Sequence, residues 1–294
     1  MKKNILIITI LFMIIYLLFK YNNIISITTI SSSYLFLSKV LPFLLPIFII
    51  SKILINYNFA YYISSIFKNN IYIYILLISF ISGCPNNVIT IKDLLKNNVI
   101  TIKEANIYLK SSFFQSPLFL YTMLKTIFNN DIAITIIVIE LITNVIIFII
   151  NPIKKNNIIK IKSKSFNDIL ITSIKESCNV MINIYITIII FNIIISLLPK
   201  IFSNFIGIIE VTQGLNYLVN SNSNTLYKLI LSVIYISFGG LSIHTQVNSI
   251  LQNSNIDYKY FLNGRIMQVI IALILLITFY CYARNFNWTF TNIS

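Results

Sequence analysis

The sequences S-G-C-P-N-N at Ser82–Asn87 and G-G-L-S-I-H-T-Q at Gly239–Gln246 interrupt or end apolar segments at corresponding places in the two halves of the chain. Hydrocarbon offers backbone amides no hydrogen-bond partner. A broken helix is therefore tolerated in a membrane only where protein or a water-filled cavity satisfies the freed groups. In a membrane protein, these two interruptions predict the place where a solute binds.

The composition indicates a membrane protein. Hydrophobic residues make up 57% of the 294 residues and charged residues 10%, and the mean hydropathy is +0.85. One soluble core could not bury so many apolar side chains. We therefore expect an all-α, polytopic integral membrane protein with interrupted or re-entrant helices, in contact with membrane lipid.

The net charge of +14 does not indicate a nucleic-acid partner, because the cations are spread between apolar runs instead of gathering on a polar surface. Cations at the ends of apolar segments are expected to reach the lipid headgroups. These are Lys2, Lys3, Lys20, Lys39, Lys52, Lys68, Lys125, Lys200 and Arg284.

The sequence contains no motif of an enzyme or a cofactor site. Cys84, Cys178 and Cys281 are far apart and have neither CxxC nor Cys/His spacing, so we expect no metal site and no disulfide. No phosphate-binding loop, dinucleotide fingerprint, zinc-protease helix or hydrolase elbow occurs. We expect a protein that is not an enzyme and that takes any energy for transport from a gradient or a partner.

In the first half we expect a retained N-terminal helix at 5–19, with cleavage as a signal peptide as the lesser alternative. A span at 34–55, kinked at Pro42 and Pro46, is long enough to cross the bilayer. Two short apolar runs follow, at 57–67 and 71–81, and the second suggests a re-entrant hairpin. A helix capped by Thr101 and Glu104 then runs, with an interruption at Ser116–Pro117, to about Phe128, before a clear span at 132–150.

The second half repeats this order after a basic stretch, 151–168, which the positive-inside rule places in the cytoplasm. Its apolar runs are 169–198, 201–219 (broken by Glu210 and Gly214), 226–241 and 266–281. A short internal match supports the repeat, because Ser79–Gly83 resembles Ser237–Gly240. We therefore divide the chain into an N-terminal transmembrane helix and connector (1–33), a first repeat (34–150), the basic loop (151–168) and a second repeat (169–294), with two pseudo-symmetric halves.

Two carboxylates fall within apolar runs, where a charge costs about 2.5 to 3.5 kcal/mol at a helix centre. Glu140 and Glu210 are therefore candidates for coupling protons. A structural pairing of Glu140 with Lys125 or Lys175 is equally open. Glu210 is the stronger candidate for a binding site, because Thr212 and Gln213 follow it at a helix break.

His244 is the only histidine and stands close to Ser242 and Gln246, just after the glycine pair that ends at Gly240. We predict that it binds a ligand or relays a proton, with Gly240, Ser242 and Gln246 as further candidate binding residues. A structural histidine, hydrogen-bonded to another helix, fits the pattern equally well.

The interrupted helices of the first half also suggest an anion site, because a helix N-terminus carries partial positive charge. The candidate binding residues there are Ser82, Gly83, Pro85, Asn86 and Ser116. Arg265 adds a planar donor suited to a carboxylate. Its alternative role is that of a juxtamembrane anchor.

The same residues carry a resemblance to a known family. The chain resembles sporulation integral membrane proteins of the YlbJ type, which belong to the nucleoside-recognition Gate domain proteins. The resemblance covers nearly the whole chain in order, through Ser82-Gly83-Cys84-Pro85, Glu104-Ala105, Ser116-Pro117-Leu118-Phe119, Glu210-Val211-Thr212-Gln213-Gly214, Gly240-Leu241-Ser242-Ile243-His244-Thr245-Gln246-Val247 and Tyr260-x4-Arg265.

The resemblance implies two Gate-like repeats in the cell membrane, or the outer forespore membrane, of a spore-forming bacterium. It also implies movement of dipicolinic acid, a small organic anion, toward the forespore. The alternatives are a nucleoside-type transporter of the same family and a non-transporting scaffold for other sporulation membrane proteins. Cys84 replaces the family's Tyr, Asn87 replaces a Gly, and Phe113 and Phe114 replace small polar residues, so the first half departs from the pattern more than the second.

Overall fold

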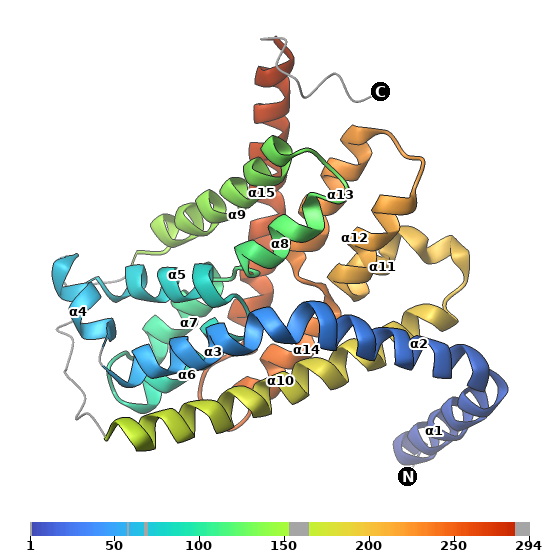
Figure 1. Ribbon diagram of the computed structural model, residues 1–294, viewed down its shortest axis with the longest axis horizontal. Coiled ribbons are helices and arrows are strands. Elements are labelled where there is room, and N and C mark those ends of the chain that lie inside the picture. Colours follow the sequence, from blue (N-terminus) through green and yellow to red (C-terminus); the bar gives the residue numbers. More distant parts are fainter. Residues whose placement is uncertain (1, 58, 68–69, 153–164, 286–294) are drawn as a thin grey trace.

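The computed structural model describes residues 2–57, 59–67, 70–152 and 165–285. All secondary-structure elements in these ranges are helices (Figure 1). Four helical stretches are long and apolar enough to cross a membrane: Asn130–Ile150, Phe166–Leu197, Thr225–Leu251, which is interrupted at Gly239, and Tyr258–Tyr282. A bent pair formed by Asn22–Ser38 and Leu41–Asn56 makes a fifth candidate. The expected all-α, multi-pass membrane protein is therefore confirmed.

The N-terminal region is more helical than the sequence predicts. Helix α1 (Lys2–Lys20) is followed at once by α2 (Asn22–Leu35), a π-helix η1 (Phe36–Val40) and α3 (Leu41–Asn56). The stretch before residue 34, expected as a connector, is helical and lies in α2. The two arms of the bent pair meet at 51° next to the π-helix, which precedes Pro42 and Pro46. A π-helix opens the backbone ladder locally and commonly bends a helix.

The first half then contains short helices and one long helix. They are α4 (Phe59–Ile66), α5 (Ile71–Ser82), α6 (Asn86–Lys96), α7 (Ile102–Ser111), α8 (Pro117–Leu124) and α9 (Asn130–Ile150). The predicted capping box is present, because the Thr101 hydroxyl accepts from the Glu104 amide and the Glu104 carboxylate accepts from the Thr101 amide. The interruption near Ser116 is longer than expected, since residues 112–116 are not helical.

The second half has the same order of elements. It consists of α10 (Phe166–Leu197), the 3-10 helix η2 (Lys200–Phe205), α11 (Ile206–Ile209), α12 (Val211–Asn220), α13 (Thr225–Phe238), α14 (Gly240–Leu251) and α15 (Tyr258–Asn285). The helix breaks at Glu210 as predicted. The second predicted break is wrong, because Gly214 lies inside α12, where its amide donates to the Glu210 carbonyl over 3.0 Å. Most of the basic stretch, 153–164, lies outside the described residues.

The halves pack into each other. In each half, two short helices fold back on one another (α5 with α6, and α11 with α12), followed by an interrupted pair and a long helix. Helix α10 packs along α2 and α3, and α15 packs against α7, α9 and α13 (Figure 1). One buried apolar cluster combines α8 and α9 with α12, α13 and α15, and another combines α5, α6 and α7 with α14. This interdigitation brings the interruptions of both halves together.

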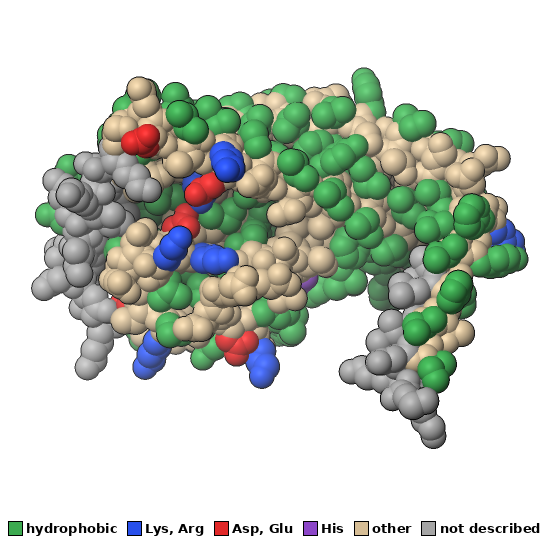
Figure 2. All heavy atoms as spheres, turned by 90° about the horizontal axis from the view of Figure 1, so that it is seen from below, with side chains coloured by type: hydrophobic (Ala, Val, Ile, Leu, Met, Phe, Trp, Pro, Cys, Tyr) green, Lys and Arg blue, Asp and Glu red, His purple; other side chains and the backbone are tan. Residues whose placement is uncertain are grey.

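The surface separates charged from apolar regions. Figure 2 shows charged side chains gathered mostly at one end of one face, whereas hydrophobic side chains are spread over the remainder. Many large apolar side chains on α1, α10 and α15 are exposed, among them Phe12, Ile182 and Ile270. Such exposure is expected where lipid replaces water as the solvent of a helix face.

Candidate functional site

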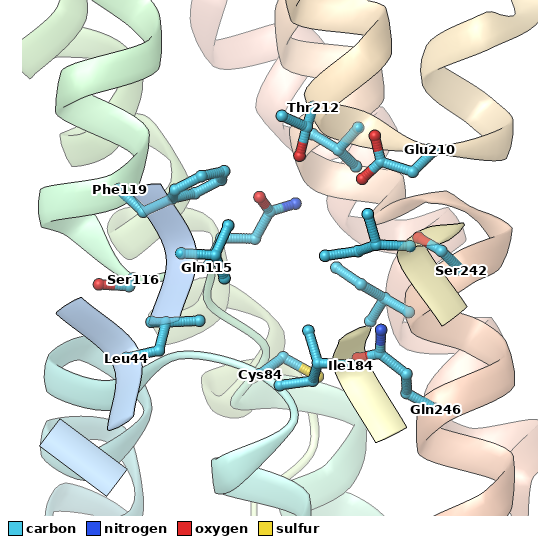
Figure 3. Close-up of a pocket in the computed structure, with 14 residues that line it drawn as sticks. Leu44, Cys84, Gln115, Ser116, Phe119, Ile184, Glu210, Thr212, Ser242 and Gln246 are labelled. Atoms are coloured by element: carbon cyan, nitrogen blue, oxygen red, sulfur yellow. The ribbon is translucent and has the colours of Figure 1, made fainter. Parts of the chain in front are cut away.

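A pocket lies where the helix interruptions of the two halves meet. It contains about 600 Å³ of empty space, open solvent at its mouth included. Figure 3 shows first-half side chains on one side of it and second-half side chains on the other. Its lining consists of Val40, Leu44, Cys84, Gln115, Ser116, Phe119, Ile184, Ile188, Glu210, Val211, Thr212, Ser242, Ile243 and Gln246.

The first-half wall is built on the non-helical segment 112–116. Three of its carbonyls accept from neighbouring elements. The Cys84 backbone amide donates to the Phe114 carbonyl over 2.7 Å, and the Asn87 side-chain amide donates to the Ser112 carbonyl over 2.8 Å. Asn144 of α9 donates to the Phe113 carbonyl over 2.5 Å. These bonds pair the carbonyls of residues 112–114 inside the protein, which lowers the cost of a non-helical backbone there.

Glycine is required at the tip of the α5–α6 hairpin. Gly83 has φ +73° and ψ −176°, a conformation essentially restricted to glycine. A Cβ there would overlap the backbone amide nitrogen of Ser116. The hairpin tip and the α7–α8 interruption therefore touch through their backbones, which places Cys84 beside Gln115 and Ser116 at the pocket.

The second-half wall is built in a similar way. Glu210 is extended between α11 and α12, and its carboxylate accepts from the Gln213 amide over 2.7 Å as the cap of α12. Gly239, with φ +87°, ends α13, and Gly240 lies close to the Ile209 carbonyl and to Val211. The two interruptions of this half are thus in contact, as they are in the first half.

Two side-chain bonds join the walls to each other and to the surrounding helices. The Gln115 side chain donates to the Ile236 carbonyl near the end of α13 over 3.3 Å. The Gln246 side chain donates to the Thr187 hydroxyl of α10 over 2.7 Å. Both glutamines are 6% exposed, so their amide groups are held in place at the pocket.

Three helices begin at the pocket, so their positive N-terminal ends are directed toward it. Ser116 precedes α8, Glu210 precedes α12, and Ser242 lies in the first turn of α14. The Glu210 carboxylate caps α12, whereas α8 and α14 have no side-chain cap. A helix N-terminus without a cap has amides available for an anionic or hydrogen-bonding ligand.

Five of the predicted site residues line this pocket: Ser116, Glu210, Thr212, Ser242 and Gln246. Ser82, Gly83, Pro85, Asn86, Gln213 and Gly240 do not line it. They shape the interruptions instead. For example, the Asn86 side chain donates to the Ser82 hydroxyl over 3.0 Å and also to the Ser51 hydroxyl, which ties the hairpin tip to α3.

His244 has the structural role that the sequence left open. One ring nitrogen is 2.6 Å from the Tyr258 hydroxyl and the other is 3.0 Å from the Phe238 carbonyl. Its ring also stacks on Phe238. Both nitrogens are therefore used to join α14 to the end of α13 and the start of α15.

Glu140 and Arg265 also lie away from the pocket lining, and both are buried, at 1% and 0% exposure. The pairing of Glu140 with Lys125 or Lys175 is wrong, because Glu140 accepts from Ser237 and Gln268. The anchor role of Arg265 is wrong as well, since its guanidinium is buried over the Phe113 ring at 3.9 Å.

Three lining residues with a thiol, an amide or an aromatic ring were not predicted as site residues: Cys84, Gln115 and Phe119. Gln115 directly precedes Ser116 in the polar interruption, so its position in the sequence was an available signal. The apolar lining from η1, α3 and α10, such as Leu44 and Ile184, carried no such signal, because it depends on how the halves pack.

Comparisons of the chain with family models, curated proteins and solved structures find no match. Among the described residues, no group of three or more His, Cys, Asp or Glu side chains is placed to hold a metal ion. The site is thus characterised by its geometry: a pocket between two sets of interrupted helices, lined mostly by apolar side chains together with hydroxyl and amide groups and one carboxylate.

Proposed function

We propose that this protein is a membrane carrier for a small organic anion, with dipicolinate, moved toward the forespore during sporulation, as the solute that its family resemblance implies. The observation that supports the proposal is the pocket between the two halves, where α8, α12 and α14 all begin. Alternating access by carriers commonly uses a site of this kind, between two repeats and beside broken helices.

The first turns of these helices favour an anionic solute. Glu210 already places a carboxylate at the N-terminus of α12, and the uncapped N-termini of α8 and α14 offer equivalent places for the carboxylates of a ligand. Phe119 at the pocket provides an aromatic contact for a planar ring. Protonation of Glu210 on solute binding would remove the repulsion between two anions and would couple solute movement to protons.

A second candidate function, transport of a neutral nucleoside-type solute, is favoured by the charges of the lining. Among the described residues that line the pocket, none is Lys or Arg. Gln115 and Gln246 present amide groups that can pair with the edge of a nucleobase. Both candidates use the same pocket, so uptake of the two solutes must be measured in parallel.

The test is uptake of radiolabelled dipicolinate and of uridine into proteoliposomes that contain the purified protein. We expect uptake of dipicolinate. Replacing Gln246 by Ala should lower the apparent affinity about tenfold, because loss of a buried hydrogen bond is worth about 1.4 kcal/mol. Gln252→Ala, at an exposed position just after α14, is the matched control and should leave uptake unchanged.

Glu210→Gln separates binding from coupling, since glutamine retains an oxygen to cap α12 but cannot carry a proton. We expect dipicolinate still to bind this variant, while a proton gradient no longer drives its accumulation. Uptake of uridine without dipicolinate would favour the nucleoside-type carrier. Uptake of neither solute, or full activity of Gln246→Ala, would contradict the proposed use of this pocket.

A further inference from the structure

Behind the pocket, four buried side chains connect three helices in an unbroken series of hydrogen bonds. Arg265 of α15 donates to the Gln268 oxygen, and the Gln268 amide donates to one Glu140 oxygen on α9. The other Glu140 oxygen accepts from Ser237 of α13 over 2.5 Å. The side chains of all four residues are at most 1% exposed, and none lines the pocket.

One end of this series holds the α7–α8 interruption. The Arg265 guanidinium lies 3.9 Å from the centre of the Phe113 ring and donates to the Lys110 carbonyl, in the last turn of α7, over 3.4 Å. Phe113 belongs to segment 112–116, which carries Gln115 and Ser116 to the pocket. Arg265 thus fixes the point at which this segment leaves α7.

The other end holds the α13–α14 interruption. Ser237 lies one residue before the end of α13, and Gly239 follows as the break. A Cβ at Gly239 would meet the Phe113 ring, so the two interruptions are in direct contact. The series therefore has one of the two interruptions at each end. The same two interruptions also touch each other directly, at Phe113 and Gly239.

The charges within the series balance each other. A buried guanidinium and a buried carboxylate are each unfavourable alone. Here the neutral Gln268 lies between them, donating to the carboxylate and accepting from the guanidinium, so every bond runs from a donor to an acceptor. The direction of each bond is set by its neighbours, and replacing one member disturbs the others.

We propose that Arg265, Gln268, Glu140 and Ser237 form a positioning relay. The relay holds the two interruptions at the separation that the pocket requires, without contacting the solute. Because the solute binds only the correctly spaced state, a weakened relay lowers the fraction of competent protein and raises the half-saturation concentration. The uptake measurement rests on the proposed function, whereas the labelling measurement below does not.

The relay can be tested by moving its carboxylate. In Glu140→Gln, the series stays hydrogen-bonded only if the Ser237 hydroxyl turns to accept from the new amide, and in every arrangement the buried Arg265 loses its counter-charge. In the exchange variant Glu140→Gln with Gln268→Glu, the carboxylate at position 268 accepts from Arg265 and from the new amide at position 140, whose oxygen accepts from Ser237. We expect half-saturation for dipicolinate uptake to rise at least tenfold in the single variant and to return to within about threefold of wild type in the exchange variant.

A second pair of variants keeps the test decisive if Glu140→Gln does not fold. Ser237→Ala removes one relay bond without leaving a net charge. Ser232→Ala is its matched control, because Ser232 is equally buried on α13 and its hydroxyl makes no hydrogen bond within the described part of the chain. We expect half-saturation to rise severalfold in Ser237→Ala, with little change in maximal rate, and to stay unchanged in Ser232→Ala.

The readout independent of transport is the labelling rate of Cys84, which lines the pocket. It is measured with N-ethylmaleimide after Cys178→Ser and Cys281→Ser, both at exposed positions. We expect labelling at least threefold faster in Glu140→Gln and Ser237→Ala, and a wild-type rate in the exchange variant and in Ser232→Ala. Equal rates for Ser237→Ala and Ser232→Ala, or an exchange variant no better than the single variant, would overturn the relay. If the wild type takes up no solute, the proposed function fails while labelling still decides this inference.

Discussion

Lys52 illustrates how far the role of one residue depends on its neighbours. Its position near the end of an apolar run suggested a cation that reaches the lipid headgroups. Instead, its side chain is only 4% exposed and lies 2.7 Å from the Asp93 carboxylate of α6 and 2.8 Å from the Glu176 carboxylate of α10. One buried cation therefore joins α3 to two other helices.

This arrangement predicts strong non-additivity between the two carboxylates. Asp93→Asn or Glu176→Gln alone should cost at most about 1 kcal/mol, because the remaining carboxylate still pairs with Lys52. The double variant should cost about 3 to 5 kcal/mol, because it leaves a buried charge without a partner. Adding Lys52→Met to the double variant should restore most of the loss. Melting temperatures of the detergent-purified proteins test this order. A double variant whose loss of stability equals the sum of the two single losses would contradict it.

The sequence marked the polar residues beside the helix interruptions but not the direction in which each side chain points. Glu210, Ser242 and Gln246 reach the pocket, whereas His244, on the same helix as the last two, points toward Tyr258 and Phe238. Residues two positions apart on a helix face different sides. Which side faces a cavity is decided by the helices that pack against α14, among them α15, which follows it directly, and α10, which lies far from it in sequence.

At the level of elements, the helix ends with local signals were predictable and those without them were not. The start of α7 followed from Thr101 and Glu104, which form a capping box whatever surrounds them. The end of α7 at Ser111 has no glycine or proline to mark it. It is set by tertiary bonds, such as the one from the Tyr72 hydroxyl to the Ser111 carbonyl over 2.8 Å.

The two glycine interruptions should tolerate substitution to different degrees. Gly83→Ala adds a Cβ that overlaps the Ser116 backbone, in a conformation that itself costs about 1 to 3 kcal/mol. Gly240→Ala meets its nearest neighbours at 3.3 Å, which small shifts can accommodate, so mainly the strain of φ +69° remains. We expect melting temperatures to fall in the order wild type, Gly240→Ala, Gly83→Ala.

Ser249→Ala, at an exposed position on α14, is the control for this series and should melt like the wild type. The series also addresses the scaffold alternative. A scaffold that needs no interruption would keep its partners in Gly239→Ala with Gly240→Ala, although the strain at both positions lowers the melting temperature of the variant. A carrier that uses the interruption would lose uptake in that variant. A Gly83→Ala protein as stable as the wild type would show that the hairpin tip does not need its close contact with Ser116.

At the scale of the whole molecule, two similar halves with a matching order of elements could be predicted, because interrupted and uninterrupted apolar runs alternate in the sequence. Their interdigitation could not. Helix α14 of the second half shares a buried cluster with α5, α6 and α7 of the first. Lys92 of α6 donates to the Ile250 and Gln252 carbonyls at the end of α14, over 2.6 and 3.0 Å. Such contacts between distant segments leave no periodic signal in the sequence.

Because each half satisfies polar groups of the other, neither should be stable alone. A fragment 1–157 would leave Glu140 and Gln115 without Ser237, Gln268 and the Ile236 carbonyl. Unpaired polar groups within the hydrocarbon cost several kcal/mol each. We therefore expect fragments 1–157 and 158–294 to aggregate when each is expressed alone, and to co-purify in equal amounts when expressed together. A cut after Asn157 leaves lysines on both sides, so each fragment keeps a cytoplasmic orientation signal.

Size-exclusion chromatography of the tagged fragments provides the measurement, and the uncut chain provides the reference melting temperature. The reassembled pair should melt only a few degrees below the uncut chain, because the cut falls between α9 and α10 and removes none of the bonds described above. The same reassembly with Glu140→Gln in the first fragment should be weaker, since that side chain bonds to Ser237 and Gln268 of the second fragment. A first fragment that is monodisperse alone would show that the halves are independent units, and the pocket would then have to form by their later association.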